Sequence, residues 1–180
     1  MPADLIPGVD VPAALLWDFD GTLVDSEKSW HVAERRLMAE WGGPPLTEAL
    51  QRSMVGNALI DTSRTLMAWA GRTDLHNDAH YADALNTYAL EDIAEVGADF
   101  RPGARELLDA ARDAGVRCAL VSASFTRVLR SVVDTLPEGS FQVVVGGDSV
   151  TRGKPDPEPY LFACAELGLS ARDCLALEDS

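Results

Sequence analysis

Asp18 and Asp20 follow a short apolar run and come directly before Gly21. In extended backbone, alternate side chains point to the same side, so these two carboxylates can enter one site. Two converging carboxylates repel each other unless a cation lies between them. The pair therefore predicts a site for Mg²⁺ and a substrate phosphate; the alternative is an ordinary Asp-Gly turn after a strand.

Three further polar groups occupy comparable places along the chain. Ser122 follows a second apolar run, Lys154 lies in a proline-rich loop after a third, and Glu178 with Asp179 follows a fourth. Together with the aspartate pair they provide a nucleophile, an acid/base, a hydroxyl, an ammonium group and carboxylates for a hard metal ion. This combination indicates phosphoryl transfer.

Each of these groups also has a purely structural interpretation. Ser122 could cap the helix that follows it, but Ser124 is the better cap, which leaves Ser122 for chemistry. Lys154 could be an exposed loop lysine, and Glu178 and Asp179 could be solvated carboxylates. The order of the four groups along the chain favours the functional interpretation.

The apolar runs predict the elements that position these groups. Runs at 13–17, 116–121, 141–145 and 174–177 are typical of buried strands, and helical stretches lie between the later ones. Strands that alternate with helices pair in parallel, so their carboxyl ends meet at one edge of the sheet. The sequence predicts an α/β fold with a doubly wound parallel sheet and all four polar groups at one crevice.

A long helical insertion interrupts this alternation. No strand pattern occurs between Asp25 and Asp99. We therefore expect a core of residues 1–25 and 98–180 and an inserted helical domain of residues 26–97, with a hinge at each end of the insertion.

Charge and composition restrict the class of partner. The formal net charge of −14 opposes binding to nucleic acid or to an anionic membrane. No apolar run reaches the length of a membrane span, and the first residues do not form a signal peptide, so we expect a cytoplasmic protein.

Four motifs, each in its structural context, make the chain resemble the haloacid dehalogenase superfamily of phosphohydrolases. In order, the matching segments are Asp18-Phe19-Asp20-Gly21-Thr22, Ser122, Gly153-Lys154-Pro155 and Glu178-Asp179. The match spans residues 15–180. The helical insertion is similar to the small cap of the phosphoglycolate-phosphatase-like and β-phosphoglucomutase-like subgroup.

The resemblance implies a role for each acidic motif residue. Asp18 is the nucleophile that forms an aspartyl-phosphate, and Asp20 protonates the leaving oxygen and then activates water. Mg²⁺ is held by the Asp18 side chain, the Asp20 carbonyl and Asp179, while Glu178 orients waters of the metal.

The same resemblance implies the phosphate and substrate contacts. Ser122 and Lys154 hold the phosphoryl oxygens. Backbone N–H groups of two loops add to this contact, at Gly21, Thr22 and Ala123. In the cap, the loop with Gly56 and Asn57 is expected to contact and recognise the leaving group.

Three features distinguish the chain from parts of the superfamily. Leu59 stands where the mutases carry a cap arginine for a second phosphate, which favours a hydrolase. Asp20 is present, whereas the dehalogenases lack it. Family members continue beyond the fourth strand, so we expect the C-terminal part of the core to be missing from these 180 residues.

The sequence thus predicts a Mg²⁺-dependent phosphatase for a small phosphorylated metabolite. The alternative enzyme is a sugar-phosphate mutase of the β-phosphoglucomutase type. The alternative outside the class of enzymes is a non-catalytic phosphate-binding module or an inactive fragment.

Overall fold

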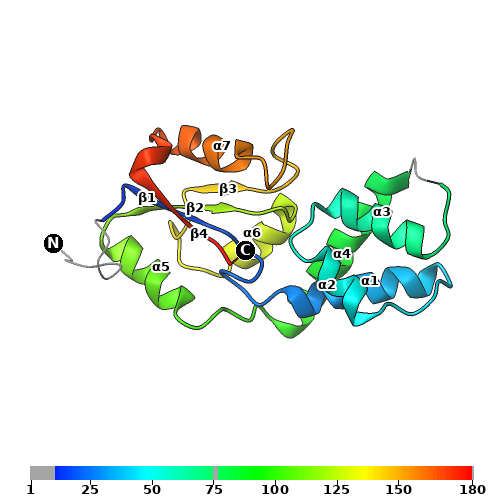
Figure 1. The fold of residues 1–180 in the computed structure, drawn as a ribbon. Coiled ribbons are helices and arrows are strands. Elements are labelled where there is room, and N and C mark those ends of the chain that lie inside the picture. The colour runs from blue at the N-terminus through cyan, green and yellow to red at the C-terminus, as the bar shows by residue number, and fades with distance from the viewer. Residues whose placement is uncertain (1–10, 75–76, 180) are drawn as a thin grey trace. The chain divides into compact units, whose positions relative to one another are not determined.

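The structure is a computed structural model that describes residues 11–74 and 77–179. The chain forms two compact units (Figure 1), one of Met1–Asp25 with Asp99–Ser180 and one of Ser26–Ala98. The second unit is one residue longer than the predicted insertion 26–97. That this unit acts as a cap stays a prediction.

The first unit contains a parallel sheet of four strands in the order β3-β2-β1-β4. The strands are β1 (Ala14–Trp17), β2 (Arg117–Val121), β3 (Val143–Val145) and β4 (Cys174–Leu177). In the register of the sheet, Leu15 of β1 lies between Cys118 of β2 and Leu175 of β4. The predicted α/β fold with a parallel sheet is confirmed.

β3 is shorter than the apolar run that predicted it. Gln142 binds the neighbouring strand through its side chain, because its Oε1 accepts the Cys118 N–H at 2.7 Å. The Gln142 N–H donates to the Cys118 carbonyl at 2.9 Å. The side-chain amide therefore replaces one step of the regular ladder, and β3 begins at Val143, two residues after the start of the predicted run.

Helices cover both faces of the sheet. They are α5 (Ala104–Asp113), α6 (Thr126–Val133) and α7 (Glu158–Leu167). Figure 1 shows α5 and α7 on opposite faces. Consecutive residues of β1 are consequently both buried, with Leu15 at 0% and Leu16 at 4% exposure, which explains why this strand is an unbroken apolar run.

The strand order determines where the chemistry of the first unit can lie. From β1 the chain moves outward to β2 and β3, and then returns to the other side of β1 as β4. In open α/β sheets, ligands bind beyond the carboxyl ends of the strands at such a reversal. The loop after β1, which carries Asp18 and Asp20, is therefore at the expected place.

The two chain segments that connect the first unit to the second lie side by side in the first unit. Val24 and Phe100 form an antiparallel bridge. The Asp25 N–H donates to the Asp99 carbonyl at 2.7 Å, and the Arg101 N–H donates to the Leu23 carbonyl at 3.0 Å. These bonds fix the ends of the insertion on the core.

The described residues of the second unit form helices joined by loops. Its helices are α1 (Glu27–Glu40), α2 (Glu48–Met54), α3 (Leu59–Trp69) and α4 (Asp78–Val96). α4 packs against α1 and α3. Its core cluster consists of Ala33, Leu37, Met38, Met54, Leu66, Leu85 and Ala89. The sequence pattern from His76 to Glu95 predicts the last of these helices, and its first residue, His76, lies outside the described residues.

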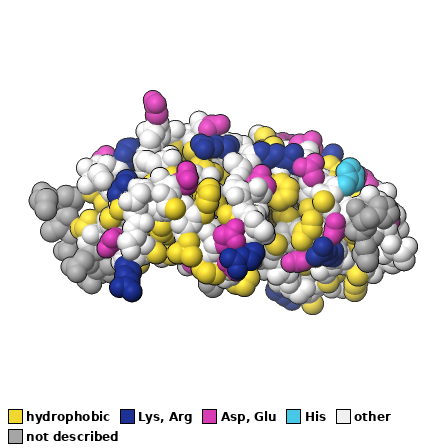
Figure 2. All heavy atoms as spheres, turned by 90° about the horizontal axis from the view of Figure 1, so that it is seen from above, with side chains coloured by type: hydrophobic (Ala, Val, Ile, Leu, Met, Phe, Trp, Pro, Cys, Tyr) yellow, Lys and Arg dark blue, Asp and Glu magenta, His cyan; other side chains and the backbone are white. Residues whose placement is uncertain are grey.

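Acidic and basic side chains are mixed on the surface. Figure 2 shows Asp and Glu side chains close to Lys and Arg side chains, with hydrophobic ones between them, on the face that it presents. Ion pairs on exposed side chains include Arg36 with Glu91 and Arg64 with Asp61. Such pairs contribute about 0–1 kcal/mol each, so the apolar cores carry the stability.

Among the helices that the structure describes, none has the length and apolar character needed to span a membrane.

One buried carboxylate of the second unit stands apart from these surface pairs. Glu34 on α1 is only 5% exposed, and its Oε2 accepts a hydrogen bond from the Gln51 side chain at 2.9 Å. Burial raises the pKa of Glu34 to about 7, although the Gln51 hydrogen bond and Arg35 oppose the rise. The folded state therefore favours the neutral carboxyl group up to a pH of about 7.

We predict that Glu34→Gln removes a pH dependence of stability. The folded pKa lies above that of the unfolded chain, so the contribution of Glu34 is fully present below the unfolded pKa and is lost as pH rises through about 7. The amide keeps an acceptor for Gln51 and has no proton to lose. At pH 8 the variant should exceed the wild type by up to ~3 kcal/mol in free energy of unfolding.

Urea unfolding across the pH range measures this difference. Glu95→Gln, an exposed carboxylate on α4, serves as the matched control and should leave the pH profile of stability unchanged. Parallel pH profiles for the wild type and Glu34→Gln would contradict the prediction.

Candidate active site

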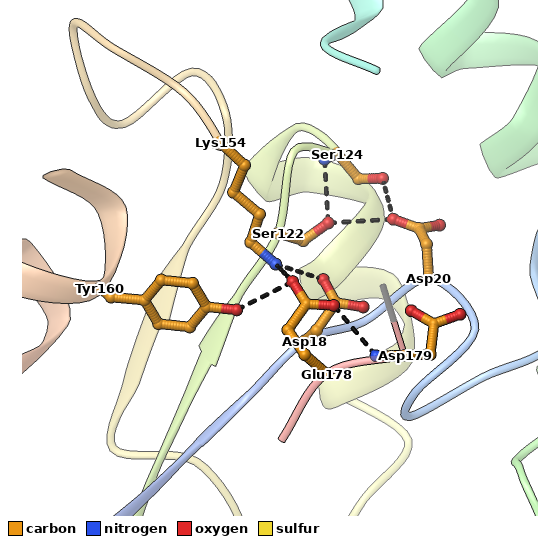
Figure 3. A network of polar contacts seen from close by, with 8 residues as sticks. All are labelled: Asp18, Asp20, Ser122, Ser124, Lys154, Tyr160, Glu178 and Asp179. Carbon is orange, nitrogen blue, oxygen red and sulfur yellow. Dashed lines mark hydrogen bonds and ion pairs between the residues drawn. The ribbon is translucent and has the colours of Figure 1, made fainter. Parts of the chain in front are cut away.

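Loops at the carboxyl ends of the strands bring one group of polar side chains together (Figure 3). This group consists of Asp18, Asp20, Ser122, Ser124, Lys154, Tyr160, Glu178 and Asp179. It contains all six side chains that the sequence placed at one crevice, and two that it did not. The exposed residues Gly56 and Asn57, expected to read the leaving group, belong to the second unit.

Lys154 bridges two carboxylates that come from opposite ends of the sequence. Its Nζ donates to Asp18 Oδ1 at 2.5 Å and to Glu178 Oε1 at 2.6 Å. Burial lowers the pKa of Lys154, but Asp18 and Glu178 outweigh burial and hold that pKa above its usual range. The ammonium group is therefore charged throughout the physiological range.

Asp18 is the most deeply buried carboxylate of the group. The residue is 5% exposed, and burial raises its pKa to about 7 in spite of Lys154. The negative charges of Asp20 and Glu178 act in the same direction as burial. A second cation beside Asp18 would favour its ionised form, which is the form that can act as a nucleophile.

The loop that carries Lys154 is held by its own side chains. The Glu158 carboxylate accepts the Thr151 N–H at 2.8 Å and the Arg152 Nε–H at 2.9 Å. Asp156 Oδ1 accepts the Glu158 N–H at 2.9 Å, at the start of α7. These bonds close the loop and fix the point from which Lys154 reaches the strands.

Tyr160 on α7 belongs to the same network, although it was not among the predicted site residues. Its hydroxyl donates to Glu178 Oε1 at 3.0 Å, the atom that Lys154 also binds. Burial raises the pKa of Tyr160 to about 12, so the hydroxyl keeps its proton at neutral pH. One feature of the sequence could have identified Tyr160 as a site residue: it lies in the first turn of the helix that follows the Lys154 loop.

Asp20 faces the loop after β2. Its Oδ2 accepts from the Ser122 hydroxyl at 3.0 Å and from the Ser124 hydroxyl at 2.6 Å. The prediction that Ser124 caps the following helix is wrong, because Phe125 occupies the N-cap and offers no side-chain hydrogen bond. The Ser124 side chain is instead turned toward the site.

Gly21 is required where the chain turns after Asp20. Its φ is +87°, and a Cβ on it would lie 2.2 Å from Asp179 Oδ2. Its N–H donates to the Val24 carbonyl at 2.8 Å, and the phosphate contact expected of this amide stays a prediction. Glycine is needed here for its conformation and for the room that it leaves to Asp179.

Thr22 and Ala123 lie in the loops after β1 and β2. The Thr22 Oγ1 is buried and has no hydrogen-bond partner among the described residues. The expected phosphate contacts of both residues concern their backbone N–H groups and stay predictions.

Three carboxylates form an acidic cluster that fits a hard divalent cation. One oxygen each of Asp18, Glu178 and Asp179 lies within 4.8 Å of the others. Lys154 supplies one positive charge against these three groups. Carboxylate oxygens are the ligands that Mg²⁺ prefers, and the missing Cβ of Gly21 keeps the place of Asp179 open.

Comparison with known proteins agrees with this geometry. A family model of haloacid dehalogenase-like hydrolases matches residues 12–180. A phosphoglycolate phosphatase of Pseudomonas putida is 32% identical in an alignment of 179 residues that covers 98% of this chain and 65% of that protein. An N-acetylmuramic acid 6-phosphate phosphatase of Pseudomonas aeruginosa is 32% identical, over 92% of this chain and 73% of its own length.

A solved structure shows the same fold. CbbY from Rhodobacter sphaeroides, in complex with phosphate, superposes with a TM-score of 0.78 at 26% identity, covering 94% of this chain and 78% of that one. The model match, the relatives and the four motifs in their strand-end positions lead to one assignment. The chain belongs to the haloacid dehalogenase-like hydrolase family.

Proposed function

We propose that this protein is a Mg²⁺-dependent phosphatase that hydrolyses the phosphate monoester of a small metabolite through a phosphorylated Asp18. The observation that carries the proposal is the buried Asp18 carboxylate, bound to Lys154 at 2.5 Å within an acidic cluster. The phosphatases among its relatives support it. The chain spans 65% of the first of these relatives, so the activity of the whole protein is part of the proposal.

The side chains divide the reaction into two displacements. The Asp18 carboxylate attacks phosphorus, the bond from phosphorus to the ester oxygen breaks, and Asp20 gives that oxygen its proton. Asp20 then takes a proton from water, whose oxygen attacks the phosphoryl group and releases Asp18. Lys154 and Ser122 hold the phosphoryl oxygens and stabilise the charge that spreads over them.

The metal would be held by Asp18 and Asp179, with Glu178 beside them and the Asp20 carbonyl as a further ligand. When bound, Mg²⁺ supplies positive charge that offsets the carboxylates and the substrate phosphate. Lys154 alone cannot provide this, because it already binds both Asp18 and Glu178.

One observation in the second unit favours a hydrolase over a mutase. Leu59, which stands at the position of the mutase arginine, is 7% exposed and begins α3. A buried apolar side chain offers no contact to a second phosphate. Release of inorganic phosphate, rather than an isomerised sugar phosphate, is the product that the proposal requires.

The first test replaces the nucleophile. Asp18→Asn keeps the shape of the side chain but removes its charge, and turnover of 4-nitrophenyl phosphate should fall at least ~1000-fold. The matched control is Asp113→Asn, a side chain that is 77% exposed on the surface. Steady-state release of nitrophenol measures both variants; activity retained by Asp18→Asn would remove Asp18 from its role.

The second test concerns the metal. Mg²⁺ at ten times its Kd should stabilise the wild type by ~1.4 kcal/mol, because it binds only the folded state. Gly21→Ala should lose this stabilisation, since its Cβ would collide with Asp179.

Gly115→Ala is the control for the second test. Gly115 has a φ of +71°, and a Cβ there would meet nothing within 4 Å. Both variants thus share the backbone strain, and only one disturbs the acidic cluster. Thermal unfolding with and without Mg²⁺ measures the effect. Full stabilisation of Gly21→Ala by Mg²⁺ would show that Asp179 does not hold the metal.

A further inference from the structure

Ser124 connects three parts of the site through three hydrogen bonds. Its Oγ donates to Asp20 Oδ2 at 2.6 Å, and its N–H donates to Ser122 Oγ at 2.9 Å. Its carbonyl accepts the Gly147 N–H at 2.9 Å. The residue is 3% exposed, so these bonds have little competition from water.

The bond from Ser124 to Ser122 determines what the Ser122 hydroxyl can do. A hydroxyl has one hydrogen to donate and can accept through its lone pairs. Because Ser122 Oγ accepts the Ser124 N–H, its own hydrogen is directed to Asp20 Oδ2, at 3.0 Å. Two hydroxyls thus converge on one carboxylate oxygen (Figure 3), and Ser124 arranges both of them.

The backbone of Ser124 is itself fixed by the loop after β3. A Cβ on Gly147 would lie 2.3 Å from the Ala123 carbonyl oxygen, so the two loops are in direct contact. Asp148 Oδ1 accepts the Thr126 N–H at 2.8 Å and the Thr126 hydroxyl at 2.7 Å. Asp148 thereby caps the helix that Ser124 was expected to cap, and this leaves the Ser124 hydroxyl for Asp20.

We propose that Ser124 is a positioning residue that holds the Asp20 carboxyl group in place for proton transfer to the leaving oxygen. The inference rests on the proposed phosphatase function. When Ser122 turns to a phosphoryl oxygen of the substrate, Ser124 continues to hold Asp20. Without the Ser124 hydroxyl, Asp20 would keep its chemistry but lose its fixed position, and general acid catalysis depends on that position.

The consequence is a selective defect. Loss of the Ser124 hydroxyl should slow hydrolysis of a substrate whose leaving group needs a proton. It should not slow the first step for a substrate with a good leaving group. 4-Nitrophenol leaves as a stable anion, but an alkyl alcohol requires protonation by Asp20. A merely structural role for Ser124 would slow both substrates by the same factor.

Ser124→Thr and Ser124→Val make the matched pair for this test. The two side chains have the same shape and differ in the hydroxyl, so any crowding at this buried position is common to both. Ser140→Ala is a further control, since Ser140 is also 3% exposed and its hydroxyl donates to the Pro137 carbonyl at 2.6 Å. Each variant is the full chain, assayed with saturating Mg²⁺.

The experiment compares two rates in each variant. One is the pre-steady-state burst of 4-nitrophenol from 4-nitrophenyl phosphate, and the other is the release of phosphate from benzyl phosphate. For Ser124→Val we expect a burst rate within ~2-fold of Ser124→Thr and a kcat for benzyl phosphate that is ~10–100-fold lower, with KM nearly unchanged. Ser124→Thr and Ser140→Ala should keep the wild-type ratio of the two rates.

Two results would overturn the inference while leaving the phosphatase function intact. Equal losses with both substrates would show a structural role, and a rise in KM without a fall in kcat would show direct contact with the substrate. A wild-type protein that hydrolyses neither ester, whatever the variants do, would instead overturn the proposed function together with this inference.

Discussion

The ammonium group of Lys154 between Asp18 and Glu178 is the contact on which the rest of the site depends. The three residues come from the loop after β1, the loop before α7 and the end of β4. The parallel sheet brings Asp18 and Glu178 together because β1 lies next to β4. Charges removed from water cost free energy unless they are paired, so the loss of one partner leaves the others uncompensated.

The same sheet gives its two aspartates different surroundings. Asp18 is buried and faces a cation, whereas Asp20 faces two serine hydroxyls from the loop after β2. In the proposed mechanism, these different environments suit different roles, Asp18 as the nucleophile and Asp20 as the acid and base. The acidic cluster of Asp18, Glu178 and Asp179 holds more carboxylates than the one cation of Lys154 can balance, and the proposed divalent cation would balance the rest.

Local sequence was sufficient for the strands and for the residues at their ends. The apolar runs are longer than a turn and shorter than a helix, and polar residues stop each of them, so β1 and β4 could be placed closely. Ser124 could not, because the start of α6 depends on Asp148, a residue of another loop. Tyr160 could not either, since the side of α7 that meets Glu178 follows from packing against β2 and β3.

The central claim is that Asp18 itself carries the phosphoryl group during turnover. Rapid acid quenching of the working enzyme, followed by proteolysis and peptide mass spectrometry, tests it most directly. The account predicts a phosphoryl adduct on Asp18 that forms within a turnover and is absent when Mg²⁺ is chelated. Turnover without any adduct, or with the phosphoryl group on another residue, would contradict it.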